Sequence, residues 1–125
     1  MAKESAVEKP PAFSDAEKAY ISGQRLLRIA TISAKPTVDV APVAFRFDGQ
    51  RFHIGGLDLK STFKYRNIKD NGHVALVIDD LKTIDPWRPR GVKIHGTGEI
   101  ATRPDGREVI EVTPTRKWSW GIDRA

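Results

Sequence analysis

The chain has 125 residues, a formal net charge of +5 and no cysteine. This length fits one domain with an adequate core but no large internal cavity, so a cofactor would lie near the surface or between two copies. The absence of cysteine excludes disulfides, thiolate nucleophiles and Cys-ligated metal centres, and the basic balance favours an anionic partner.

The sequence predicts neither a secretory signal at its start nor a membrane span. No apolar run approaches the roughly 20 residues of a membrane span, and residues 1–11 are polar and charged, without the apolar stretch of a secretory signal. We therefore expect a cytoplasmic protein that does not enter a membrane. Residues 1–12 are predicted to form a mobile tail, and residues 13–125 a single domain.

The first half of the domain predicts one helix and then strands. Ser14 with Glu17 three residues later is a capping-box pattern, so a helix should begin there and end near Gly23. The β-branched run 28–33 predicts a first strand, and the run 38–47 a second. Pro42 lies inside the second run and removes one ladder donor, which favours a sheet edge, a bulge or a place where a ligand meets the backbone.

The next strands flank a short helix. Asp48-Gly49 is a hairpin signal that leads into a third strand, with Phe52 and Ile54 on one face and Arg51 and His53 on the other. After the helix, the apolar run 73–78 predicts a strand that is buried on both faces. We expect that strand to end at Asp79-Asp80 and a loop rich in proline and arginine to follow over 81–91.

The last third again alternates. In the run 92–100 the apolar positions point one way, and Lys93 and His95 point the other way. A turn at 104–106 and a last full strand over 108–113 follow. Trp118 and Trp120 come at alternate positions, which is more typical of core or interface packing than of a ligand contact. About six hairpin-spaced strands with two short helices predict a mainly β (α+β) antiparallel barrel.

The segment 60–72 carries the most informative chemistry. Ser61 or Thr62 is placed to cap the short helix, with Lys60 just before it and Lys64 on its first turn. A helix N-terminus has free N–H groups and a partial positive charge, so added lysines favour a phosphate there. The alternative for the same residues is an ordinary capped helix with a solvated basic face.

Other chemistry has little support in the sequence. His53, His73 and His95 lie on three different strands without metal-ligand spacing, so no metal site is predicted. Asp79 and Asp80 are adjacent on a strand and point to opposite faces. There is no Gly-x-Ser-x-Gly and no dinucleotide fingerprint before a long helix. We therefore predict no catalytic side chain, and expect a cofactor to supply the reactivity of an enzyme.

Four segments, in this order and spacing, carry a resemblance to a known family. They are Arg28-Ile-Ala-Thr-Ile-Ser33, Val40-Ala-Pro-Val-Ala-Phe45, the run from Phe63 to Val77, and the run from Val92 to Ile100. Together they resemble the pyridoxamine 5'-phosphate oxidase-like, flavin-binding split β-barrel family. The segments 85–90 and 118–122 are similar to its deazaflavin-dependent oxidoreductases, which use coenzyme F-420.

The resemblance implies a six-stranded antiparallel split barrel that forms a homodimer, with the cofactor at the interface. The implied cofactor is coenzyme F-420, an 8-hydroxy-5-deazaflavin, or else FMN. By similarity Lys64 and Asn67 hold its phosphate, and the backbone of Pro42, Val43 and Ala44 meets its ring. Thr62 stands where relatives often carry a basic residue.

The rest of the implied site comes from two places. Lys60 and Ser61 complete the phosphate seat, and the partner subunit contributes Trp87, Arg88 and its C-terminal segment. The subgroup favours F-420 over FMN. The extra negative charge of F-420 would be met by further basic residues, either as ligands or only as a solvated surface: Arg66, Lys69, Lys82, Arg88 and Arg90.

The expected activity is hydride transfer between the reduced cofactor and a small organic acceptor. A carrier that binds the same cofactor without catalysis is the alternative, because no clear acid or base group accompanies the site. A nucleic-acid binder is not expected. The cations cluster on a helix and a loop and do not line a strand face interleaved with aromatic residues.

Overall fold

The computed structural model describes residues 10–122, so most of the predicted tail over 1–12 lies outside the described residues. The elements in chain order are α1 (Asp15–Ser22), β2 (Leu26–Ile32), β3 (Val38–Ala44), β4 (Arg46–Phe47), β5 (Phe52–Ile54), the 3-10 turn η1 (Leu59–Ser61), α2 (Phe63–Asp70), β6 (His73–Thr83), β7 (Arg88–Thr102) and β8 (Glu108–Trp120).

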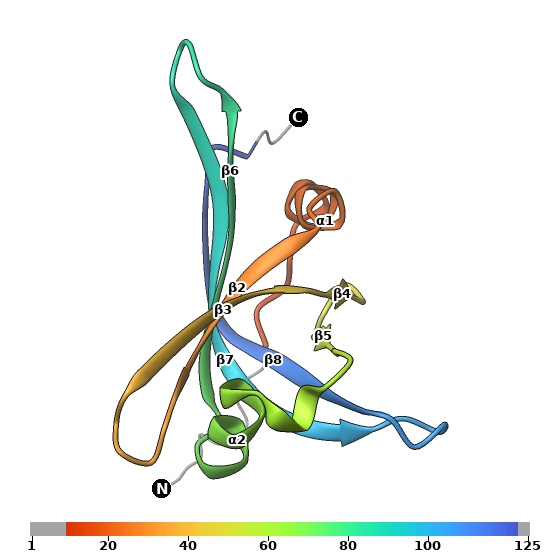
Figure 1. Cartoon of the computed structure of the whole chain (residues 1–125). Coiled ribbons are helices and arrows are strands. Elements are labelled where there is room, and N and C mark those ends of the chain that lie inside the picture. Colours follow the sequence, from red (N-terminus) through yellow and green to blue (C-terminus); the bar gives the residue numbers. More distant parts are fainter. Residues whose placement is uncertain (1–9, 123–125) are drawn as a thin grey trace, which may run out of the picture.

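The strands form one curled antiparallel sheet in the order β3-β2-β6-β7-β8-β5-β4 (Figure 1). The two edges of this sheet, β3 and β4, are consecutive in the chain and separated only by Phe45. The sheet therefore curls almost into a closed barrel, and the barrel is open where the edge strands β3 and β4 do not pair. This confirms the predicted mainly β split barrel, with seven strands because the predicted run 38–47 is two strands.

The core fills the inside of the curl. Alternate residues of β2, β6, β7 and β8 point inward, and Ile29, Leu76, Ile94 and Ile110 are almost completely buried. Both helices contribute to the same core, α1 through Tyr20 and Ile21 and α2 through Tyr65 and Ile68. The helices therefore lie on the inner side of the sheet and leave its outer side uncovered.

The start of α1 is as predicted. Ser14 accepts a hydrogen bond from the Glu17 amide, and the Glu17 carboxylate accepts one from the Ser14 amide, which is a complete capping box. Glu17 also pairs with Lys117 of β8 at 2.9 Å. The helix ends at Ser22, before Gly23, and is tied to the last strand.

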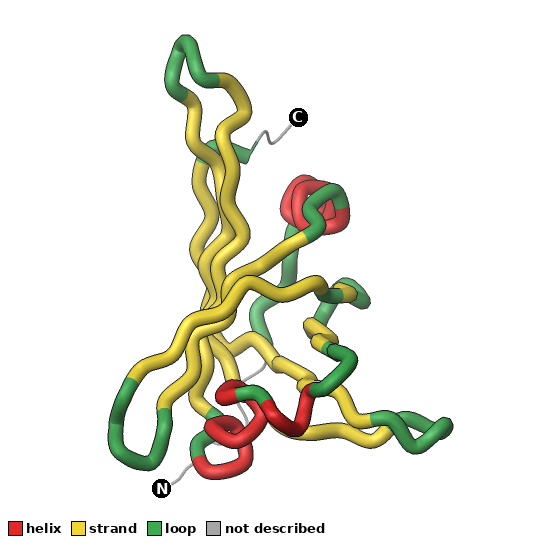
Figure 2. The backbone as a smooth tube through the Cα atoms, viewed as in Figure 1, coloured by secondary structure: helices red, strands yellow, loops and turns green. Residues whose placement is uncertain are grey.

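The hairpin of β6 and β7 is much longer than predicted. We expected a loop over 81–91, but β6 runs to Thr83 and β7 begins at Arg88, so only four residues turn the chain. The two strands project from the sheet as an arm (Figure 2). Asp80 lies directly opposite Arg90 and pairs with it at 2.7 Å. Cross-strand ion pairing thus continues the ladder where the apolar pattern ends.

Two further expectations were wrong. The last strand was predicted over 108–113, but β8 continues to Trp120 because Gly91, Val92 and Lys93 of β7 still pair with it. The run 73–78 was predicted to be buried on both faces. In the structure Val74, Leu76 and Ile78 are buried, whereas Ala75 and Val77 lie half-exposed on the outer face.

Candidate functional site

The predicted phosphate seat is the start of α2. Thr62 has an extended backbone and is the N-cap, and its Oγ1 accepts a hydrogen bond from the Tyr65 amide at 3.3 Å. The same hydroxyl donates to the carbonyl of Leu59 at 2.6 Å. Of the two predicted capping residues, Ser61 and Thr62, it is therefore Thr62 that caps α2. Its hydroxyl proton is already donated to Leu59 and is not free for a ligand.

The two residues before Thr62 also have partners. Ser61 Oγ lies within hydrogen-bonding distance of the Asp58 carboxylate, at 2.8 Å. The Lys60 ammonium is largely exposed and lies 3.7 Å from Glu108. Glu108 in turn accepts a hydrogen bond from the Tyr65 hydroxyl, which raises the pKa of Tyr65. These contacts fix η1 and α2 to the start of β8.

Lys64 differs from its neighbours. It is half-buried on the first turn of α2, and it has no ion pair with any residue among 10–122. The amides of Phe63 and Lys64 also have no backbone acceptor in this part of the chain, as expected at a helix start. A half-buried ammonium beside free amides is suited to a phosphate group. The residues present therefore fit a phosphorylated cofactor at this place.

Asn67 lies three residues after Lys64 on α2 and is buried. Its amide nitrogen donates to Oγ1 of Thr31 in β2 at 3.0 Å, and Thr31 is only 1 % exposed. The contact joins α2 to the sheet. Asn67 therefore ties α2 to the sheet, and its contact with a cofactor phosphate stays a prediction.

The residues predicted to meet the cofactor ring lie on β3, which is an edge strand as Pro42 suggested. Pro42 lies opposite Arg28 of β2, and Val43 lies opposite Leu27. The side chain of Val43 is buried, while Pro42 and Ala44 are exposed. Since α2 packs against both β2 and β3, the structure brings the phosphate seat and this strand into one region.

Trp87 and Arg88 are not part of that region within one chain. They lie at the tip of the β6–β7 arm, at the opposite end of the molecule from α2 (Figure 1). Trp87 is 68 % exposed. Arg90, which we expected to meet extra negative charge, is paired with Asp80 on the arm. Within the described chain, the tip of the arm and α2 therefore do not form one site.

The outer face of the sheet has a mostly apolar hollow of about 460 Å³. Its lining comes from β2, β3, β6, β7 and β8 and includes Ile32, Val38, His73 and His95. His95 stacks edge-on against Trp118 at 4.7 Å between ring centres. The polar position of His95 was predicted, but the hollow was not, because it depends on which strands are neighbours.

Sequence reasoning missed a buried histidine. We expected His53 to lie on the polar face of its strand, yet it is 8 % exposed. Its Nε2 lies 2.8 Å from the Asp48 carboxylate, and its Nδ1 lies 2.6 Å from the Arg103 guanidinium. No group of three His, Asp or Glu side chains within 10–122 is placed to hold a metal ion.

Comparisons with known proteins agree with this architecture. The family model described as pyridoxamine 5'-phosphate oxidase matches residues 13–120. A Streptomyces rimosus protein named 5a,11a-dehydrotetracycline/5a,11a-dehydrooxytetracycline reductase is 36% identical over 121 residues, which cover 89% of this chain and 84% of that protein.

Solved structures show the same fold. A conserved hypothetical protein from Mycobacterium tuberculosis has a TM-score of 0.70 at 19% identity, covering 90% of this chain and 89% of the other. A protein titled F420 reductase has a TM-score of 0.60 at 24% identity, covering 75% of this chain and 89% of the other.

These findings confirm the family resemblance drawn from the four segments. The family match and the reductase relative together support an oxidoreductase with a flavin-type cofactor. No helix within 10–122 is long and apolar enough to span a bilayer.

Proposed function

We propose that this chain, which belongs to the pyridoxamine 5'-phosphate oxidase family, is a reductase that holds a phosphorylated flavin or deazaflavin at the start of α2. One observation carries the proposal. Lys64 is a half-buried cation without an ion pair in the described chain, and it lies beside two free amides of the same helix turn. Such a group is costly to bury unless an anion accompanies it.

The chain's own residues would bind and orient the cofactor. Lys64 and the amides of Phe63 and Lys64 would hold its phosphate, and the exposed side of Pro42 and Ala44 would lie beside its ring. Thr62 and Ser61 contribute position only, because their hydroxyls have partners within the chain. A bound flavin or deazaflavin would supply hydride for a small organic acceptor, and no side chain is assigned as acid or base.

We favour coenzyme F-420 over FMN. The support is the similarity to the reductase from Streptomyces rimosus and to the protein titled F420 reductase, together with the likeness of segments 85–90 and 118–122 to deazaflavin enzymes. The functional unit is a homodimer in which the tip of one arm, with Trp87 and Arg88, completes the partner's site. The exposure of Trp87 and the distance of the tip from α2 support this arrangement.

Replacing Lys64 tests the proposal. We expect Lys64→Ala to weaken cofactor binding at least about tenfold, because one charge-assisted contact to phosphate is lost. FMN and F-420 are titrated separately and followed by absorbance and fluorescence. Lys18→Ala is the matched control, since Lys18 is an exposed residue of α1 and its replacement makes the same change in net charge. Equal affinities for the two variants would refute the phosphate seat.

A carrier without catalysis remains the second candidate, because the described site has no carboxylate or imidazole assigned to proton transfer. Turnover separates the two functions. A reductase oxidises the reduced cofactor in the presence of one member of an acceptor panel. A carrier binds the cofactor with the same Lys64 dependence and oxidises it with none of them.

A further inference from the structure

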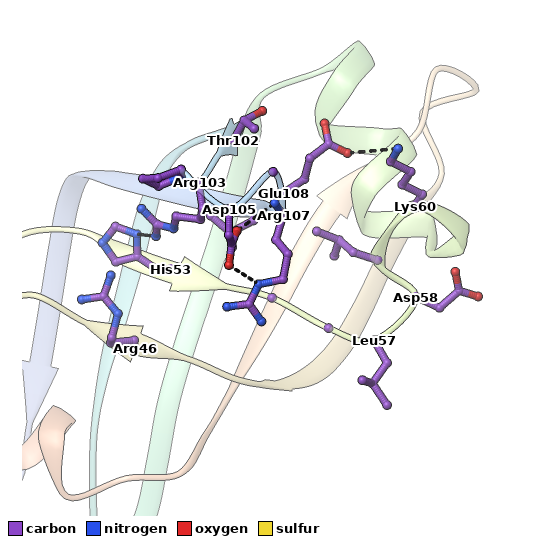
Figure 3. A pocket seen from close by; sticks show the side chains of 16 residues that line it. Arg46, His53, Leu57, Asp58, Lys60, Thr102, Arg103, Asp105, Arg107 and Glu108 are labelled. Atoms are coloured by element: carbon purple, nitrogen blue, oxygen red, sulfur yellow. Dashed lines mark hydrogen bonds and ion pairs between the residues drawn. The ribbon is translucent and has the colours of Figure 1, made fainter.

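A second basic site lies beyond η1. A cleft of about 1010 Å³ opens between the end of β5, η1 and the turn that joins β7 to β8 (Figure 3). Four cationic side chains from three segments line it, namely Arg46 of β4, Lys60 of η1, and Arg103 and Arg107 of the β7–β8 turn. Neither the composition nor any motif brings these residues together, because β4 and the β7–β8 turn are far apart in the sequence.

The carboxylates of this cleft are already engaged. Asp105 pairs with Arg107 at 2.9 Å, and Asp58 lies 2.8 Å from Ser61 Oγ. Glu108 accepts the hydrogen bond of Tyr65 at 2.9 Å and lies 3.7 Å from Lys60. Each acidic group that lines the cleft therefore has a partner, and none of them forms an ion pair with Arg46 or Arg103.

Arg46 and Arg103 are the two arginines of the cleft without an acidic partner among residues 10–122. Within residues 10–122 neither has a carboxylate at ion-pair distance, and Arg46 makes no side-chain hydrogen bond. Both lie beside His53, and Figure 3 shows their side chains on either side of its ring. Two cations that face one cleft repel each other, so the cleft favours an anion between them.

A buried histidine holds Arg103 in this position. A guanidinium is always protonated, so the 2.6 Å contact requires His53 Nδ1 to be the acceptor. The His53 proton then lies on Nε2 and is donated to Asp48 at 2.8 Å. With Nδ1 as the acceptor, the His53 ring orients Arg103, and the other N–H donors of Arg103 remain for a ligand. The Glu111 carboxylate lies 3.7 Å from the same ring nitrogen.

We propose that this cleft binds a small organic anion with two or more acidic groups, held by Arg46 and Arg103 with Lys60 at its rim. A guanidinium pair suits carboxylate or phosphate because each can bind such a group through two hydrogen bonds. Lys60 lies in the same stretch as the start of α2, so the cleft adjoins the proposed cofactor seat. The anion is either the acidic tail of a bound cofactor or a free phosphorylated compound.

The test uses two probes, tri-γ-glutamate and inorganic pyrophosphate, in calorimetric titrations of the full chain at low ionic strength. We expect at least one probe to bind and Arg46→Gln to weaken it at least about tenfold. Arg25→Gln makes the same change in net charge on an exposed arginine elsewhere and should change affinity less than twofold. Binding of only tri-γ-glutamate identifies a cofactor tail, and binding of only pyrophosphate identifies a free phosphorylated compound.

Repeating the titrations with Lys64→Ala separates the cleft from the cofactor seat. Binding that survives Lys64→Ala and is lost in Arg46→Gln supports the cleft, even if the cofactor proposal fails. Arg103→Gln provides a second variant, and the circular dichroism spectrum of each variant checks that it is folded. The proposal is overturned if neither probe binds, if Lys64→Ala abolishes binding, or if Arg25→Gln weakens it as much as Arg46→Gln.

Discussion

At the scale of single residues, Asn67 ties the helix that carries Lys64 to the sheet. Its amide donates to Thr31 in a place that solvent scarcely reaches. We expect Asn67→Ala to lower the free energy of unfolding by about 1–3 kcal/mol, because the Thr31 hydroxyl loses a buried partner. Urea unfolding measures the change. The cofactor affinity should fall as well, since α2 loses its tie to β2.

Thr31→Val provides the control for this pair. If the Asn67 amide and the Thr31 hydroxyl stabilise the fold through their hydrogen bond, the double variant should lose less unfolding free energy than the two single variants together. Strict additivity would mean that Asn67 stabilises the fold through some other contact.

Asp80 makes stability depend on pH. The hydrogen bond from Arg90, and after it those from Tyr20 and Gln24, hold the pKa of Asp80 below its usual value against the effect of burial. A lowered folded pKa gives stability that is present above the unfolded value of about 3.9 and is lost as pH falls through the folded value. We expect Asp80→Asn to cost about 1–2 kcal/mol near neutral pH and progressively less below pH of about 4.

Unfolding curves at several pH values check this expectation. Asp79→Asn is the matched control, because Asp79 is the exposed neighbour whose only recorded ion pair, with Arg28, is 3.5 Å long. That substitution should change stability by less than about 0.5 kcal/mol at any pH. A pH-independent effect of Asp80→Asn would contradict the charge-based account.

The sequence predicted the helix caps correctly but missed contacts between distant segments, and the reason is physical. The cap at Thr62 and the capping box at Ser14 depend on neighbours within four residues, so the sequence contains them. The second bond of Thr62 to Leu59, the burial of His53 and the freedom of Arg46 depend on the packing of distant segments. No local pattern encodes such contacts.

At the scale of elements, Gly96 allows β7 and β8 to pair closely at an irregularity in their register. A Cβ at Gly96 would lie 2.6 Å from the carbonyl oxygen of Thr113, a backbone atom that cannot move aside alone. We expect Gly96→Ala to cost about 1–3 kcal/mol by overpacking. Thermal unfolding followed by circular dichroism measures the loss.

Gly56→Ala is the comparison for that change, because a Cβ there meets no atom within 4 Å. It should leave the melting temperature nearly unchanged. Similar losses in both variants would contradict the overpacking account, because the effect of alanine on the unfolded chain alone would raise stability.

Strand existence was easier to predict than strand length. The alternation over 92–100 and the turns at Gly49 and Gly106, both with positive φ, were confirmed. The arm was missed because Asp79, Asp80 and Pro89 have poor strand propensity taken singly. Asp80 and Arg90 stabilise strands only as a pair across the ladder, and Pro89 is tolerated near the end of the hairpin.

At the scale of the whole molecule, the outer face of the sheet lacks the apolar cover that the helices give the inner face. Val38 is 70% exposed and Val40 is 65% exposed, beside the apolar hollow formed with Ile32 and Ala75. Trp87 projects from the far end of the arm. A second copy on the outer face would bury these residues and bring an arm to the candidate site, which links assembly to cofactor binding.

The last prediction follows from that link. Val40→Glu would place two unpaired carboxylates in a twofold interface, one from each copy, so we expect the dimer dissociation constant to rise at least about tenfold. Sedimentation velocity measures the assembly, and the Lys64-dependent titration measures the cofactor affinity, which should fall in parallel. Leu57→Glu adds the same charge at an exposed apolar residue of the basic cleft and should leave the dimer intact. A dimer that survives Val40→Glu, or one that Leu57→Glu dissociates equally, would exclude the outer face as the interface. In either case the proposed link between the outer face and cofactor binding would fail.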